Sequence, residues 1–233
     1  MKAGSLRKNL KERQVWIVLI LGLCVMGITG FFLLRSVLWS RQDEQASLLR
    51  IVSLERPLES AYRPRLGLCR GVELEADCAE AMERMLQAAE QADCSLSLGE
   101  GYLSRETLRQ RYEQQLLALA AKGLSPEAAE LQLMVGLHYP GTSEHELGLS
   151  ADLSPAEGRE KECQRWLREH SWEYGFVLRY PEGKLEWTGR ELLPWHYRYV
   201  GPEAAAQMQQ LDLCLEEYTL WFYSDDAIIL LDD

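Results

Sequence analysis

Histidine is scarce in this chain, with only four among 233 residues. Motifs of several common enzyme classes are absent as well. The sequence contains no glycine-rich phosphate loop and no G-x-S-x-G element around a serine, which argues against nucleotide chemistry and against a serine hydrolase elbow. The six cysteines never show the C-x-x-C spacing of a cysteine zinc site. Candidates for a catalytic or metal centre are therefore few.

Basic residues are also in deficit. The chain has 25 Lys and Arg against 36 Asp and Glu, a net charge of −11. Five of the 25 basic residues, but only one of the 36 acidic residues, lie in the first fourteen positions, so the remainder is more acidic still. An acidic surface of this kind argues against nucleic acid and anionic lipid as partners.

Charge is missing altogether from residues 15–34, VWIVLILGLCVMGITGFFLL. A helix of this length, at about 1.5 Å per residue, spans roughly the 30 Å of a bilayer core. A cleaved signal peptide is the alternative, but its apolar core usually runs about 7–15 residues. We therefore expect an uncleaved single-pass anchor, with the basic residues 1–14 in the cytoplasm and the rest of the chain outside the membrane.

Beyond the anchor, we expect a stalk at residues 35–54, one α+β domain at 55–220 and a C-terminal tail at 221–233. Met82, Met85, Leu86 and Ala89 recur at helical spacing. Helices are predicted at 79–92, 105–123, 125–137, 158–175 and 202–220, and strands at 94–104, 150–155 and 176–183. A strand pair is predicted over 184–201. Helices thus come first and a mostly antiparallel sheet follows, with helices flanking it.

Five cysteines follow the anchor: Cys69, Cys78, Cys94, Cys163 and Cys214. Outside the cytoplasm some of them can pair, and Cys69 with Cys78 is the nearest couple in sequence. An odd number leaves at least one without a partner in the same chain. The sequence does not assign the pairs. Cys163 lies in a charged helix, where packing is a commoner role than nucleophilic catalysis.

His145, Asp152 and His196 are the candidates for a metal site. His145 and Asp152 lie seven residues apart with Gly148 between them, which suits one ligand on a loop and a second on the strand after a turn. Zinc accepts imidazole nitrogen and carboxylate oxygen at about 2.0–2.2 Å, and a catalytic site keeps a fourth position for water. On spacing alone, an ordinary surface pair remains the commoner explanation.

Three longer stretches resemble the VanY-like zinc D-alanyl-D-alanine carboxypeptidases, in the superfamily of lysostaphin and the hedgehog domain. They are PGTSEHELGLSADLS at 140–154, WLREHSWEYGFVLRYPEGK at 166–184 and PWHYRYVGPEAA at 194–205. The first matches the signature S-x-H-x-x-G-x-A-x-D, with Ser150 where alanine is usual. The resemblance covers about residues 55–220. It implies a single zinc-peptidase domain with Zn²⁺ on His145, Asp152 and His196, but not on His138 or His170. It also implies a peptidoglycan stem peptide as substrate, contacted by Ser143, Tyr102 and Trp195.

Two departures from the family pattern affect the residues expected to do the chemistry. The family places a general-base glutamate three residues before the last histidine, and this chain has Leu193 there. The family's S-G-Y-R-S run, whose arginine and serine hold the terminal carboxylate of the peptide, reads Glu100-Gly-Tyr-Leu103-Ser. Leucine accepts no proton, and a general base contributes about 10²–10⁴-fold. Both changes argue against ordinary D,D-carboxypeptidase activity.

Several residues could compensate for these losses. Glu191 or Glu100 could act as a substitute base, and Arg105 or Arg109 could supply the missing cation. Two hypotheses therefore stand. The chain is a membrane-anchored zinc metallopeptidase that trims stem peptides, or it is an inactive peptidase-fold module that binds zinc and a cell-wall peptide or protein partner.

Overall fold

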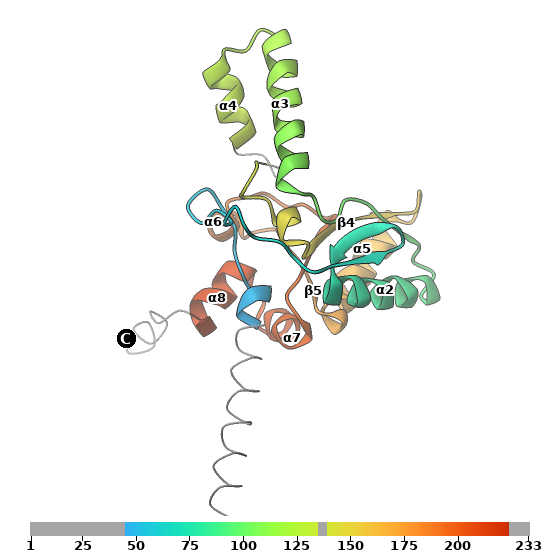
Figure 1. Cartoon of the computed structure of the whole chain (residues 1–233). Helices are drawn as coiled ribbons and strands as arrows, with labels where there is room; N and C mark the ends of the chain where they lie inside the picture. The colour runs from blue at the N-terminus through green and yellow to red at the C-terminus, as the bar shows by residue number, and fades with distance from the viewer. Residues whose placement is uncertain (1–44, 135–138, 224–233) are drawn as a thin grey trace, which may run out of the picture. The chain divides into compact units, whose positions relative to one another are not determined.

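The computed structural model describes residues 45–134 and 139–223 (Figure 1). The anchor predicted at 15–34 and His138 lie outside these residues. Within the described ranges, no helix is both long and apolar enough to span a bilayer. The packed body begins at Leu48. Leu49 and Val52, which lie in the segment predicted as a stalk, are buried in it, so part of that segment contributes to the core.

A four-stranded antiparallel sheet forms the centre of the fold, as the predicted α+β class requires. Its order is β3 (Leu96–Leu98), β4 (Ser150–Pro155), β6 (His196–Tyr199) and β5 (Phe176–Leu178). A separate hairpin, β1 (Leu66–Cys69) and β2 (Val72–Glu75), was not predicted. Its two turn residues, Arg70 and Gly71, both have positive φ, at 49° and 85°. That conformation is favoured in two-residue hairpins because its twist matches that of the strands.

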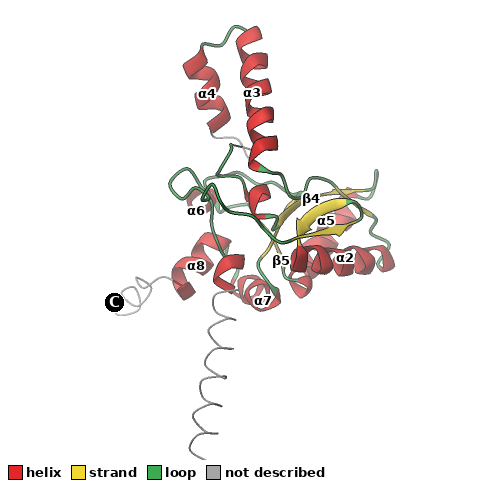
Figure 2. Cartoon of the chain, viewed as in Figure 1, coloured by secondary structure: helices red, strands yellow, loops and turns green. Residues whose placement is uncertain are grey.

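The main core lies between the sheet and two helices, α2 (Ala76–Gln91) and α5 (Glu160–His170), which Figure 2 shows close together beside the strands. The predicted apolar face of α2 is confirmed, since Met82, Met85, Leu86 and Ala89 are all buried. A one-turn helix, η2 (Ser171–Tyr174), follows α5 and leads into β5.

Helices α3 (Arg105–Ala121) and α4 (Pro126–Met134) form a hairpin that stands away from the sheet (Figure 1). Both were predicted, and each begins at a serine cap. Ser104 Oγ accepts from the Thr107 N–H, and Ser125 Oγ accepts from the Ala128 N–H. Each of these helices has only one buried residue, so most of the hairpin surface faces solvent.

Two sequence predictions near the C-terminus were wrong in part. The strand pair predicted over 184–201 is a short helix, α6 (Leu185–Thr188), followed by a loop and the single strand β6. The closing helix is two helices, α7 (Pro202–Leu211) and α8 (Leu215–Tyr223). Asp212 separates them because it adopts a left-handed conformation at φ 52°, which ends α7.

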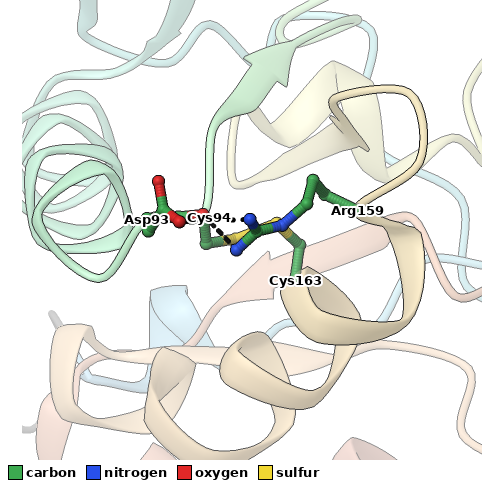
Figure 3. Close-up of a disulfide and its surroundings, with 4 residues drawn as sticks. All are labelled: Asp93, Cys94, Arg159 and Cys163. Carbon is green, nitrogen blue, oxygen red and sulfur yellow. Dashed lines mark hydrogen bonds and ion pairs between the residues drawn. A yellow bond between two sulfur atoms is a disulfide. The ribbon is translucent and has the colours of Figure 1, made fainter.

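A disulfide joins Cys94, just before β3, to Cys163 in α5 (Figure 3). Beside it, the Arg159 guanidinium donates to the side chain and the carbonyl oxygen of Asp93. Cys163 is therefore a structural residue, as expected. Cys69, Cys78 and Cys214 are buried free thiols, so the nearest couple in sequence does not pair.

The disulfide closes a sequence separation of 69 residues. A loop of this size constrains the unfolded chain by about 4 kcal/mol. We expect dithiothreitol to lower the free energy of unfolding by about that amount in urea titrations followed by tryptophan fluorescence. A Cys94→Ala, Cys163→Ala double variant is the control, and its unfolding should not respond to the reductant. An equal response in both proteins would contradict the assignment.

Candidate metal centre

Asp152 and His196 are direct partners across the sheet. In the antiparallel register of β4 and β6, Asp152 lies opposite His196. Side chains at paired positions project from the same face of a sheet, with Cβ atoms about 4.5–5.5 Å apart. Oδ1 of Asp152 is 2.7 Å from Nδ1 of His196. Two ligands that lie 44 residues apart in sequence are thus brought together by strand pairing alone.

His145 comes from the 3₁₀ turn η1 (Glu144–Leu147), which immediately precedes β4. Gly148 ends this turn at φ 73°, and a side chain there would meet the Glu75 backbone nitrogen at 2.8 Å. Only glycine fits this position. Nδ1 of His145 bonds the carbonyl oxygen of Gly101 at 2.7 Å, which fixes the ring, while Nε2 lies 4.0 Å from Asp152 Oδ1.

The three side chains fit a zinc ion. Each offers a ligand atom, and these atoms lie within 4.8 Å of one another. Both histidines are buried, and Nδ1 of His196 faces Asp152 while its Nε2 lies 3.9 Å from Oε2 of Glu144. A backbone carbonyl that holds the second ring nitrogen of a ligand is typical of metal-binding histidines. A donor set of two imidazoles and one carboxylate, which leaves the fourth tetrahedral position to water, is that of a catalytic zinc site.

A buried ionic network surrounds Glu144 behind His196. Arg179 donates to Glu144 at 2.6 Å, and both of its terminal nitrogens donate to the carboxylate of Glu216 in α8. Arg198 lies 3.1 Å from Glu144, and Ser150 donates to it at 3.0 Å. Burial alone would raise the pKa of Glu144. The two guanidinium groups outweigh burial, so this pKa lies well below its ordinary value and the group is an anion.

That anion acts on the nearest metal ligand. Oε2 of Glu144 is 3.9 Å from Nε2 of His196. Burial tends to lower the pKa of His196, but the neighbouring carboxylates of Asp152 and Glu144 outweigh it and the pKa is raised. An environment that favours a proton on this imidazole also favours a metal cation. Sequence reasoning missed Glu144 and Arg179, although both lie inside stretches that resemble the family.

Leu193 lies where the family pattern has its general base. Its N–H donates to the Tyr180 carbonyl at 3.1 Å, and its carbonyl accepts from the His196 N–H at 3.2 Å. The turn therefore ties residue 193 to the backbone of the metal ligand His196, but the side chain at this position is alkyl. Glu191 is exposed, and neither it nor Glu100 belongs to the three-residue cluster.

The residues proposed to compensate are engaged in other contacts. Glu100 forms an ion pair with Arg111 of α3 at 2.5 Å. Arg105 donates to the buried Glu146 at 2.8 Å and to a backbone carbonyl, so it is a structural residue. Arg109 pairs with Glu106 on the exposed side of α3. Arg111, the partner of Glu100, was not predicted as a compensating cation.

The predicted substrate contacts differ in exposure. Ser143 is 1% exposed, and its hydroxyl accepts from the His145 N–H at 3.3 Å, so it caps the ligand turn. Tyr102 is half-buried, and Trp195 is 42% exposed next to His196. A substrate contact from each of these three side chains stays a prediction. His170, which was excluded as a ligand, bonds Glu173 instead.

The family profile of D-alanyl-D-alanine carboxypeptidase, VanY, matches residues 71–202. The chain belongs to the VanY family. It is 35% identical over 180 residues to a D-alanyl-D-alanine carboxypeptidase of Enterococcus faecalis, covering 76% of this chain and 67% of that protein. It is 33% identical over 191 residues to the putative carboxypeptidase YodJ of Bacillus subtilis, covering 74% and 67%.

Solved VanY structures agree with this fold. VanYB in complex with D-alanine-D-alanine superposes with a TM-score of 0.66 at 33% identity, covering 76% of this chain and 99% of that one. A mutant of the D,D-pentapeptidase VanY from a VanB-type resistance cassette, in complex with Zn(II), gives 0.64 at 34% identity, covering 74% and 98%. The VanY resemblance and the zinc prediction are confirmed, and the described cluster His145, Asp152 and His196 fits that ion.

Glu144 is expected to strengthen zinc binding through His196. Glu144→Gln keeps the size of the side chain but removes its charge, and loss of such an outer contact typically lowers metal affinity 10–100-fold. Competition with a fluorescent zinc chelator measures the change. Glu173→Gln is the matched control, because it alters a carboxylate on a histidine outside the cluster. Unchanged zinc affinity in Glu144→Gln would contradict the assigned role.

Proposed function

We propose that this chain is an extracytoplasmic, D-alanyl-D-alanine carboxypeptidase-like zinc protein that takes peptidoglycan stem peptides at the His145–Asp152–His196 centre. The observation that carries the proposal is the cross-strand pairing of Asp152 with His196, joined by His145 from the adjoining turn. Membership of the VanY family supports the substrate class. Bound zinc supplies a water of lowered pKa, near 7, and polarises the peptide carbonyl.

We further propose that residues 15–34 anchor the protein in the cell membrane, with residues 1–14 in the cytoplasm. The uncharged stretch and the basic residues before it support this topology. The Cys94–Cys163 disulfide supports an oxidising location for the body of the protein. A cell-wall substrate and an extracytoplasmic domain are consistent with each other.

The chain's own residues prepare the centre for a peptide. Gly101 holds His145 in one orientation, and Asp152 and His196 are fixed by the sheet. Trp195 presents an exposed ring beside the last ligand. Hydrolysis also needs a group that takes a proton from the attacking water within about 3.2 Å or through one further water. Leu193 does not supply it, so hydrolysis would require Glu191 or Glu100.

A second candidate function is binding of the stem peptide without hydrolysis. The turn at Leu193 favours it, because the backbone presents residue 193 to the centre as the family pattern expects, yet the carboxylate is missing. The pairing of Glu100 with Arg111 and the exposure of Glu191 favour it too. In this case the zinc centre serves to hold a peptide or a protein partner.

Restoring the carboxylate is the direct test. We expect Leu193→Glu to raise D-Ala release from a stem pentapeptide ending in D-Ala-D-Ala by about 10²–10⁴-fold, the usual contribution of a general base. The assay uses the zinc-loaded full chain in detergent, and Leu192→Glu, one residue away, is the matched control.

The wild-type rate decides between the two functions. Release above a Leu193→Glu, His196→Ala blank would indicate a relocated base, which Glu191→Gln and Glu100→Gln would then identify. Zinc retention and peptide binding without release would indicate the binding function. Failure of both wild type and Leu193→Glu to bind the peptide would overturn the proposed substrate class.

A further inference from the structure

We propose that Arg111 receives the C-terminal carboxylate of the stem peptide, in place of the arginine that the family pattern has at residue 103. This inference rests on the proposed function and names the residue that would set its specificity for free C-termini. Three features carry it: the position of Glu100 at the metal centre, the face of α3 that carries Arg111, and the ion pair between them.

The backbone of Glu100 is hydrogen-bonded to β4, the strand that bears the metal ligand Asp152. The Gly99 N–H donates to the Asp152 carbonyl at 2.7 Å, and the Asp152 N–H donates to the Glu100 carbonyl at 3.0 Å. Two consecutive residues thus oppose Asp152, as in a β-bulge, an arrangement that redirects side chains and is frequent beside active sites. The next residue, Gly101, holds the His145 ring. Glu100 therefore lies at the rim of the centre.

Helix α3 directs Arg111 toward this rim. Arg105, Leu108 and Arg111 recur at intervals of three, which places them along one side of a helix. Arg105 is fixed to the buried Glu146, and Leu108 is fully buried, so this side faces the body of the protein. Arg109 lies on another side and pairs with Glu106 near the surface. Arg111 is thus the arginine of α3 that reaches Glu100.

The Arg111–Glu100 pair is accessible and has capacity for a second anion. The two side chains are 39% and 37% exposed, with Nη1 of Arg111 2.5 Å from Oε1 of Glu100. A guanidinium carries five N–H donors and binds carboxylates in a forked geometry. Arg179 demonstrates the arrangement in this molecule, since it binds the carboxylates of Glu144 and Glu216 together.

This arrangement explains together the two substitutions in the 100–104 run, Glu100 and Leu103. With leucine at 103, the loop no longer supplies a cation. A cation that enters instead from a long side chain on α3 needs an acceptor to hold it at the rim, and Glu100 provides one. The acid at residue 100 is then the positioning residue for Arg111, and the pair as a whole does not repel a peptide carboxylate.

Binding of two matched peptides tests the proposal. One is a stem pentapeptide ending in D-Ala-D-Ala as the free acid, and the other is the same peptide with a C-terminal amide. Isothermal titration uses the zinc-loaded full chain in detergent, with product formation monitored. We expect the wild type to bind the acid at least about tenfold more tightly than the amide, as a charge-assisted bidentate contact would produce.

Arg111→Gln should abolish this preference by weakening the acid alone, and Arg111→Lys should restore part of it. Arg109→Gln is the matched control on the same helix and should keep the full preference. Zinc stoichiometry and circular dichroism check that each variant is folded.

Equal binding of acid and amide by the wild type, or an intact preference in Arg111→Gln, would overturn the role of Arg111 and leave the proposed function standing. Binding of neither peptide would overturn both. The acid–amide comparison therefore separates failure of this inference from failure of the substrate class.

Discussion

The pairing of β4 with β6 is the constraint on which the rest of this structure depends. It sets Asp152 opposite His196, and a shift of one residue would send one of the two ligands to the other face of the sheet. The register is secured from both sides, by β3 next to β4 and by β5 next to β6. The buried faces of α2 and α5 pack against the sheet, and the Glu144 network lies behind His196. Both hold the ligands where the strands place them.

The departures from the family pattern at residues 100, 103 and 193 change side chains within this framework. The backbone turn at residue 193 still carries hydrogen bonds to Tyr180 and His196, and the loop at 100–103 still holds His145. A site can thus lose its proton acceptor without losing its metal ligands, because ligand placement depends on strand register while proton transfer depends on one side chain. Arg111 illustrates the converse, in which a lost charge is replaced from a neighbouring helix.

Much of this could be predicted from sequence, and the failures have physical causes. The ligands His145, Asp152 and His196 were found through motifs, and α2 through its apolar spacing. The first strand of the pair predicted over 184–201 was wrong because the segment forms α6, a helix of four residues that is too short to show the apolar period of a helix. The Cys94–Cys163 pair and the Arg111–Glu100 pair depend on tertiary contacts between distant or separate elements, which local patterns do not report.

X-ray absorption at the zinc edge of the loaded protein tests the central claim most directly. We predict a shell of nitrogen and oxygen ligands at about 2.0–2.2 Å with scattering from two imidazoles. In His145→Ala this shell should lose one imidazole. A sulfur shell at about 2.3 Å would indicate that a buried thiol binds the metal. That result, or a spectrum unchanged in His145→Ala, would contradict the centre described here.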